Sequence, residues 1–315
     1  MSGLFDLHCD TALGIYQTSE SLKKNNGDVD LERFSVFDKK AQVFAIWSPQ
    51  TMTEDECFVN FKNCYEYFKN QLEQHSDEIC LCTSKEDLQK GFESKKLCGI
   101  LGVEDVRLLG GDLDRLHVLH ECGVRVVTLG WQGETSVCGG FDTETGLTPF
   151  GYEVLKECEG LGITVDVSHL SERSFWDVAG KATKPFIASH SCSFAVQGHK
   201  RNLTDMQYRT IASFNGIVGV NLVGAHLSDE LLKEDTTSTA VYEAFYRHTE
   251  HFLEMSESTL GLGLDFDGSS PLPGVEDISC IPNLYEALYN KGIDSDTIER
   301  VSFDNAYRFF EENLK

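Results

Sequence analysis

The chain has 315 residues, 41% of them hydrophobic, and its 27 basic and 51 acidic side chains give a formal net charge of −24. This length suits a single α/β barrel, and the apolar fraction is sufficient for a large core. A surface this acidic repels phosphate backbones and anionic lipids. We therefore expect neither nucleic acid nor a membrane as a partner.

The N-terminal segment MSGLFDLHCDTA has no basic region followed by a long apolar region, because Asp6 and Asp10 interrupt it. It therefore does not have the pattern of a signal peptide. No stretch approaches the roughly 18–20 apolar residues needed to cross a bilayer. The eleven cysteines are odd in number, dispersed, and include no CxxC pair. We therefore predict a reduced, cytoplasmic protein.

Eight short apolar or β-branched segments predict strands. They lie at 3–8, 41–47, 98–104, 124–131, 163–169, 185–190, 216–222 and 259–265. Between most of them, apolar residues recur with a period near 3.6, which predicts helices. These helices are expected at 55–75, 112–121, 149–160, 172–180, 203–213, 238–256 and 283–291, with a last helical region at 295–313. Strands that alternate with helices indicate a parallel sheet.

Eight repeats favour closure of this sheet into a (β/α)8 TIM barrel, with residues 1–315 as one domain. An open doubly wound sheet is the alternative, but no GxGxxG turn follows the first predicted strand, so a dinucleotide-binding fold has little support. Segments 17–38 and 132–148 are expected to be long loops. The second follows the fourth strand and would overhang the face where the strands end.

Potential metal ligands stand at the C-terminal ends of four predicted strands. They are His8, Asp10, Glu104, His169 and His190. In a parallel barrel the ends of all strands meet on one face, so residues far apart in sequence can surround one centre. His8 and Asp10, two residues apart, would share one side of an extended strand. Glu104 offers two oxygens and could bridge two ions.

Three imidazoles and two carboxylates suit zinc, with cobalt or manganese as substitutes. Two such ions about 3.5–4 Å apart could share a hydroxide and polarise a carbonyl. A single histidine at a strand end is more often a structural residue, the HxD pair is a weak motif, and Glu104 followed by Asp105 is compatible with an exposed acidic loop. The joint occurrence of all five favours a metal centre.

Two further residues are candidates for catalysis and substrate binding. Asp265 ends the apolar run TLGLGL and could take a proton from a metal-bound water, although a DxDG turn is also compatible with a surface calcium-like loop. Arg201 lies in a small basic cluster ten residues after His190 and could hold a substrate carboxylate with two hydrogen bonds. A surface arginine before the next helix is its alternative.

Seven motifs, taken in order, resemble the renal or membrane dipeptidase family of zinc peptidases over most of the chain. They are DLHCDT (6–11), GVE (102–104), GLTPFG (146–151), DVSHLSE (166–172), ASHS (188–191), KRNLTD (200–205) and GLDFDG (263–268). The resemblance implies an amidohydrolase-type (β/α)8 barrel with two zinc ions. Carried over by position, it implies that His8 and Asp10 bind the first zinc, that Glu104 bridges, and that His169 and His190 bind the second. It also implies that Arg201 holds the substrate's C-terminal carboxylate and that Asp265 is the acid/base.

The chain departs from the animal members of this family after the fourth strand. Where they have Leu-Thr-His, this chain has Leu129-Gly130-Trp131. Trp131 is expected to contact substrate, but its indole N–H can donate only one hydrogen bond and carries no charge. With no signal or anchor sequence, the chain resembles a soluble, bacterial-type member. The resemblance also implies a homodimer.

The function predicted from these observations is hydrolysis of dipeptides, including those with a D-residue at the C-terminal position, by a hydroxide held between two zinc ions. The substrate would then be a small molecule. A metal-dependent amidohydrolase acting on a non-peptide amide, lactam or ester is the alternative. A binding protein that has kept the barrel but lost catalysis is a third reading, and the presence of all five ligands speaks against it.

Overall fold

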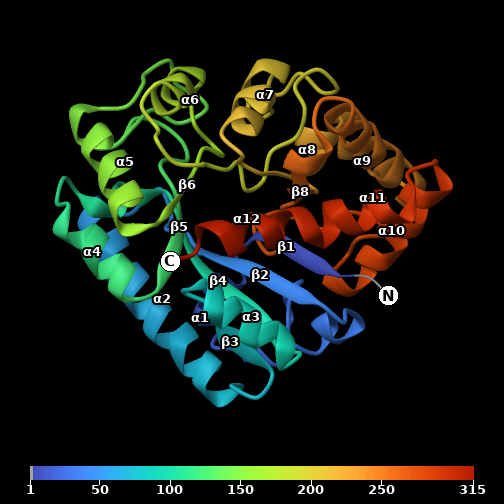
Figure 1. Ribbon diagram of the computed structural model, residues 1–315, viewed down its shortest axis with the longest axis horizontal. Helices are drawn as coiled ribbons and strands as arrows, with labels where there is room; N and C mark the ends of the chain where they lie inside the picture. Colours follow the sequence, from blue (N-terminus) through green and yellow to red (C-terminus); the bar gives the residue numbers. More distant parts are fainter. Residues whose placement is uncertain (1–2) are drawn as a thin grey trace.

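The computed structural model describes residues 3–315 and contains a curled sheet of parallel strands (Figure 1). Along the sheet the order is β6-β5-β4-β2-β1-β8-β7, and β3 pairs with β4 outside this path. The strands are β1 (Leu4–Cys9), β2 (Lys40–Ile46), β3 (Ile79–Leu81), β4 (Leu97–Glu104), β5 (Val124–Thr128), β6 (Thr164–Asp166), β7 (Val218–Val220) and β8 (Leu260–Leu262). β3 pairs with the first residues of β4, and β5 pairs with β4 from Leu101 onward.

The segment around Ile187 closes the sheet into a barrel. Val167 N–H donates to the carbonyl of Ile187 at 2.8 Å on the β6 side, and Ala188 N–H donates to the carbonyl of Ile217 at 3.0 Å on the β7 side. Eight parallel segments therefore complete the ring, which agrees with the predicted (β/α)8 fold. The predicted strand at 185–190 makes only single bridges, to Asp166 and Val218.

Side chains explain why 185–190 forms no regular strand. The backbone N–H of Ser189 donates to Asp166 Oδ1 at 2.9 Å, and that of His190 donates to Ser168 Oγ at 3.1 Å. These N–H groups are satisfied without a backbone ladder, since side chains compete with neighbouring strands for them. The strands predicted at 124–131, 163–169, 216–222 and 259–265 are shortened at the same end of the barrel, where the chain turns toward the site.

Helices surround the strands (Figure 1). The α-helices are α1 (Thr11–Thr18), α2 (Glu54–Gln74), α3 (Lys85–Glu93), α4 (Asp114–Glu121), α5 (Pro149–Leu161), α6 (Glu172–Ala179), α7 (Asp205–Ser213), α8 (Gly224–Leu227), α9 (Ser238–Leu253), α10 (Ile281–Asn290), α11 (Ser295–Glu299) and α12 (Asn305–Asn313). Short 3₁₀ helices lie at Arg33–Val36, Val106–Leu109, Asp229–Leu232, Glu257–Thr259 and Ile278–Cys280, and a π-helical turn, Arg300–Asp304, joins α11 to α12. Within residues 3–315, no helix combines the length and apolar composition needed to span a bilayer.

Most predicted helices are present within a few residues of their expected ends, whereas α1, α3 and α8 were not predicted. Thr53 caps the start of helix α2: its side chain accepts a hydrogen bond from Glu56 N–H, while the Glu56 side chain accepts one from Thr53 N–H. Such a reciprocal cap satisfies amide groups that a helix start leaves free. Segment 132–148 is a long loop as expected, with isolated antiparallel bridges between Glu134 and Gly139 and between Gly140 and Leu170.

Helix α12 covers the barrel at the N-terminal ends of its strands (Figure 1). The ring of Phe310 stacks on that of Phe5 at a centroid distance of 5.1 Å. Leu7, Val43 and Ile100 belong to the same buried cluster. We call this apolar end the floor of the barrel and the opposite end, where the strands finish, the mouth. Because apolar side chains fill the floor, an active site is expected at the mouth.

Candidate metal centre and active site

The mouth brings together all five residues predicted as metal ligands, and Glu104 lies between the others. Its Oε2 atom is 3.6 Å from His8 Nε2, and its Oε1 atom is 2.9 Å from His169 Nε2 and 3.6 Å from His190 Nε2. His8 Nε2 is 3.4 Å from Asp10 Oδ2, and the Nε2 atoms of His169 and His190 are 2.8 Å apart. The two oxygens of one carboxylate therefore face two separate groups of donor atoms.

The electrostatics of this cluster fit a cation. All five side chains belong to buried residues, and His8 Nε2 has no hydrogen-bond partner. Burial raises the pKa of Glu104 well above its usual range. The pKa of His8 is lowered by burial, but Glu104 and Asp10 outweigh this effect and raise it to about 10. Buried carboxylates with too little positive charge around them are stabilised by a bound cation.

The surroundings of the other two imidazoles, His169 and His190, favour the neutral form. Burial lowers the pKa values of His169 and His190 well below the usual range, and the positive charge of Arg201 adds to this effect. His169 Nε2 lies at ion-pair distance from Glu104, but an imidazole without a proton on that atom is the form that binds metal. Three imidazole nitrogens and two carboxylates are a donor set that suits zinc. The residues present therefore fit the metal pair that the sequence predicts.

A buried hydrogen-bond chain orients His190. Ser189 Oγ donates to Asp166 Oδ2 at 2.6 Å and lies 2.7 Å from His190 Nδ1, which can donate to it. Thr128 Oγ1 also donates to Asp166, at 2.7 Å. With its proton on Nδ1, His190 keeps the Nε2 lone pair for a metal, as second-shell partners of metal ligands commonly ensure. Neither Asp166 nor Ser189 was predicted, although DVSH places an acidic residue three positions before a proposed ligand.

Strained backbone is concentrated at the mouth. His169, Asp265 and Asp105 have φ angles of 67°, 62° and 67°, in a region that residues other than glycine rarely occupy. Asp105 directly follows Glu104. Strain of this kind costs about 1–3 kcal/mol per residue and is retained mainly where a site requires it. Here it turns coordinating side chains inward just beyond the strands that carry them.

Asp265 lies beside the donor cluster. Its Oδ1 atom is 3.8 Å from His8 Nε2, and the ligand atoms of Asp265, His8 and Asp10 all lie within 4.8 Å of one another. Burial raises the pKa of Asp265 to about 7, and the charges of His8 and Arg201 oppose this rise. A carboxyl group that titrates near neutrality can exchange a proton with a reacting group.

Arg201 is buried near the same cluster and has unused hydrogen-bonding capacity. One terminal nitrogen, Nη2, donates to the carbonyl of His190 at 3.3 Å, while Nε has no partner. Burial lowers the pKa of Arg201. The negative charges of Asp265 and Glu104 oppose this effect, yet neither carboxylate forms an ion pair with the guanidinium. A buried guanidinium without a paired carboxylate leaves room for a carboxylate from a ligand.

Two cavities meet at this centre. One, of about 460 Å³, is lined by Asp10, Glu104, Arg201 and Asp265 and also by Trp131. The ring of Trp131 lies 5.2 Å from that of Trp47 and 5.7 Å from that of His169, so an aromatic wall faces the donor cluster. Trp131 was predicted at this site, whereas Trp47, which follows β2 and has a buried indole N–H without a partner, was not.

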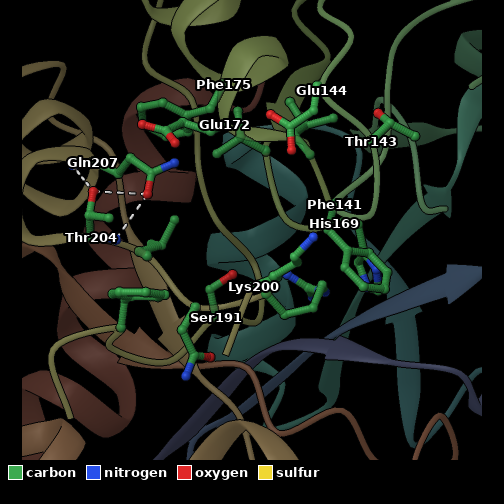
Figure 2. Close-up of a pocket in the computed structure, with 16 residues that line it drawn as sticks. Phe141, Thr143, Glu144, His169, Glu172, Phe175, Ser191, Lys200, Thr204 and Gln207 are labelled. Carbon is green, nitrogen blue, oxygen red and sulfur yellow. Dashed lines mark hydrogen bonds between the residues drawn. The ribbon is translucent and has the colours of Figure 1, made fainter. Parts of the chain in front are cut away.

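The second cavity, of about 330 Å³, shares Phe141, His169 and Arg201 with the first. Figure 2 shows Glu144 and Glu172 on one side of it and Lys200 on the other. Loop 132–148 supplies Phe141, Thr143 and Glu144, so the loop overhangs the mouth as predicted. The mouth therefore offers two adjoining compartments with the donor cluster and the buried arginine at their junction.

Comparisons with known proteins agree with this architecture. A family model described as membrane dipeptidase, peptidase family M19, matches residues 1–315. An uncharacterized protein from the pqqA 5′ region of Klebsiella pneumoniae is 33% identical over 249 residues, which are 76% of this chain and 90% of that protein. Dipeptidase tcpJ of Claviceps purpurea is 29% identical over 247 residues, 76% of this chain and 57% of its own length.

Solved structures give the same result. A dipeptidase described as an M19 metallopeptidase superposes with a TM-score of 0.92 at 26% identity, covering 99% of both chains. A metallopeptidase from Rhodobacter sphaeroides, liganded with a phosphinate mimic of the dipeptide L-Ala-D-Ala, has a TM-score of 0.91 at 25% identity, covering 100% of this chain and 99% of its own. The predicted fold and family are thereby confirmed: the chain belongs to the membrane dipeptidase family, M19, of metallopeptidases.

Proposed function

We propose that this chain is a binuclear zinc dipeptidase that hydrolyses dipeptides, including those with a D-residue at the C-terminal position. The observation that carries the proposal is the position of Glu104, whose two oxygens face His8 on one side and His169 and His190 on the other. The Rhodobacter relative that binds a mimic of L-Ala-D-Ala supports the tolerance for a D-residue.

In this proposal His8 and Asp10 would hold the first zinc, His169 and His190 would hold the second, and Glu104 would serve as a ligand to both. Such a pair of ions, when bound, lowers the pKa of a water molecule and polarises the scissile carbonyl. The chain itself supplies the orientation: Ser189 fixes the His190 ring, and the strained backbone at His169 aims that imidazole at Glu104.

Asp265 is proposed as the group that accepts the proton of the attacking water and passes it to the leaving amine. It lies close enough to His8 to reach an atom held at the centre, and it lines the larger cavity. Cations bound nearby lower the pKa of this carboxyl group, which keeps it in the proton-accepting form at neutral pH. The charge of Arg201 acts in the same direction.

Arg201 is proposed to bind the C-terminal carboxylate of the dipeptide. Its guanidinium is buried between the two cavities and lacks a carboxylate partner among residues 3–315. A substrate with a free carboxylate one residue beyond the scissile bond satisfies it, while a longer peptide does not place a carboxylate there. Trp131 and Trp47 form the wall against which the substrate packs.

The test begins with metal analysis of the purified protein, for which we expect about two zinc ions per chain. The zinc-loaded protein is then offered L-Xaa-L-Xaa dipeptides, L-Xaa-D-Xaa dipeptides and N-acyl amino acids. Hydrolysis of the dipeptides, with a large rise in KM in Arg201→Met, supports the proposal. Turnover confined to N-acyl amino acids or other non-peptide amides, lactams or esters would replace it with an amidohydrolase function, and one ion per chain would remove the binuclear centre.

We also propose that the chain works in the cytoplasm as one domain and as a homodimer. All eleven cysteines are free thiols in the structure, which suits a reducing compartment. The two ends of the chain share one core, because β1 pairs with β8 and α12 packs on β1. Light scattering of the purified protein measures the subunit number, and a single unfolding transition is expected for one domain.

A further inference from the structure

Three cysteine thiols meet at the floor of the barrel, at the opposite end of β4 from Glu104. Cys80 lies on β3, Cys82 follows that strand, and Cys98 lies near the start of β4. Their Sγ atoms all lie within 4.8 Å of one another, and those of Cys80 and Cys82 are 3.9 Å apart. Cys80 and Cys98 are direct partners in the register of β3 and β4. We call these three residues the floor thiols.

Gly91 of α3 shows where the floor thiols point. A Cβ atom added to Gly91 would lie 2.5 Å from Cys98 Sγ, 2.7 Å from Cys80 Sγ and 3.9 Å from Cys82 Sγ. The first two distances are far shorter than a van der Waals contact. The three sulfur atoms therefore converge beneath the backbone of α3, in space that is free because Gly91 has no side chain.

The surroundings of the floor thiols are apolar. Cys82 and Cys98 are fully buried with Leu88, whereas Cys80 is partly exposed and packs against this cluster together with Phe92. Apart from one another, their hydrogen-bond acceptors are backbone carbonyls, at distances of 3.6–3.9 Å, which are weak contacts. In the part of the chain that the structure describes, no imidazole or carboxylate joins the three sulfurs as a fourth ligand.

The floor thiols are distant from the proposed zinc centre. Cys98 and Glu104 stand six residues apart on one strand, which corresponds to about 20 Å at roughly 3.3 Å per residue. The apolar interior of the barrel, including Ile100, separates them. An ion bound at the floor would therefore take no part in the chemistry at the mouth.

We propose that Cys80, Cys82 and Cys98 form a three-thiolate site for a soft, thiophilic metal ion such as Cu(I) or Cd(II). Thiolate sulfur selects soft ions, while structural zinc sites almost always use four ligands. Each thiol that binds the ion releases its proton to solvent. Partly exposed Cys80 provides the entry path, and buried Cys82 and Cys98 shield the bound ion from water.

The test is a titration of the reduced, zinc-loaded protein with Cd²⁺, followed by the ultraviolet charge-transfer absorption of cadmium–thiolate bonds. The donors at the mouth are nitrogen and oxygen atoms, so cadmium bound there gives no such band. We expect one equivalent per chain to saturate the signal. In Cys82→Ser and Cys80→Ser the affinity should fall more than about a hundredfold, since loss of a group behind a ligand already costs about 10–100-fold.

The matched control is Cys122→Ser, which removes a partly buried thiol that belongs to no cluster. It should bind Cd²⁺ as the wild type does, and dipeptide hydrolysis should be unchanged in all three variants. Circular dichroism before titration shows whether each variant is folded. If Cys82→Ser does not fold, Cys80→Ser provides the test. Absence of the band in the folded wild type, or equal affinity in a folded floor variant, would overturn the proposal. So would a disulfide between two floor thiols that is present in the purified protein and whose reduction fails to restore Cd²⁺ binding.

Discussion

The two ends of β4 differ in almost every physical property. At the mouth, Glu104 is a buried carboxylate among imidazoles, and the residue after it, Asp105, has a strained backbone. At the floor, Cys98 lies among apolar side chains, where Phe5 stacks on Phe310. Eight residues of one strand thus connect a charged, strained region to an apolar, closely packed one. The barrel separates function from stability along the strand axis, as parallel barrels generally do.

This contrast has a measurable consequence. Buried charge and strain cost free energy and are retained for chemistry, so replacing a mouth residue should reduce activity more than stability. Packing at the floor contributes to stability and not to hydrolysis, so replacing a floor residue should reduce stability more than activity.

The largest effect is expected for Asp265→Asn. Removing the proton acceptor should lower kcat by about 10²–10⁴-fold, the usual contribution of a positioned acid or base. Zinc content should stay near the wild-type value, because the five proposed ligands are intact. The melting temperature should not fall, since burial already disfavours the charge of Asp265 in the metal-free protein. Asp267→Asn, two residues further on, is the control and should lose much less activity. A loss below tenfold in Asp265→Asn would assign proton transfer to another group.

The next largest effect is a loss of stability at low pH that depends on His248. This residue holds the segment after His190 through a hydrogen bond. Ser193 N–H donates to His248 Nδ1 at 3.0 Å, and His248 Nε2 lies 2.9 Å from the carbonyl of Leu227. Burial lowers the pKa of His248 to about 4; the hydrogen bond to Leu227 opposes this, and the charges of Arg247 and His251 add to it. The unfolded chain, with a pKa near 6.5, binds a proton more readily than the folded one.

The sign of the pH dependence follows from these two pKa values. The stabilisation is complete above pH about 6.5 and is lost as the pH falls toward about 4, because the unfolded state takes up protons first. At about 1.4 kcal/mol per pKa unit, the full loss is about 3 kcal/mol. Urea unfolding at pH 7.5 and 5 should show a smaller drop in His248→Gln than in the wild type. Replacement of His117, an exposed histidine, is the control and should keep the full drop. An unchanged drop in His248→Gln would contradict the assignment.

A smaller effect is expected for Ser189→Ala, which removes the hydroxyl group that links Asp166 to His190 by hydrogen bonds. Loss of a group that orients a metal ligand weakens metal binding by about 10–100-fold. Dialysis against graded chelator, with metal analysis, measures this change. The control is Ser191→Ala, because the Ser191 hydroxyl is equally buried but has no hydrogen-bond partner. If both variants bind zinc equally well, the hydrogen bond to His190 Nδ1 has no role in holding the metal.

Sequence patterns were sufficient for the barrel and for the positions of the proposed ligands, and the reason is geometric. Apolar runs that end at a polar residue mark both the strand and the end of the barrel where that residue lies. His8 and Glu104 were found in this way because each lies at or next to the end of an uninterrupted run of strand residues, Leu4–Cys9 for β1 and Leu97–Glu104 for β4. Arg201 and Trp131 lie beyond strand ends: Arg201 was predicted from the basic cluster that follows His190, and Trp131 from the family resemblance.

The remaining features depend on contacts that no local pattern records. The segment around Ser189 lacks a regular ladder because side chains satisfy its backbone, and the same hydroxyl that does not continue the strand orients His190. β3 is only three residues long, which is too short for an apolar pattern to predict a strand there. Without β3, nothing indicated that Cys80 lies beside Cys98, and the cysteines appeared dispersed.

The smallest effect is expected at the floor, where two influences oppose each other in Gly91→Ala. In an exposed helix, alanine is favoured over glycine by about 1 kcal/mol. At Gly91 the added carbon would lie 2.5 Å from Cys98 Sγ, and overpacking of a core costs about 1–3 kcal/mol. We therefore expect a net loss of about 1 kcal/mol in the free energy of unfolding, with unchanged kcat. Gly160→Ala in α5 is the matched control, because nothing lies within 4 Å of its added carbon, and it should stabilise the protein. If Gly91→Ala stabilises equally, the sulfur atoms do not converge there, and the floor is less closely packed than the contrast with the mouth requires.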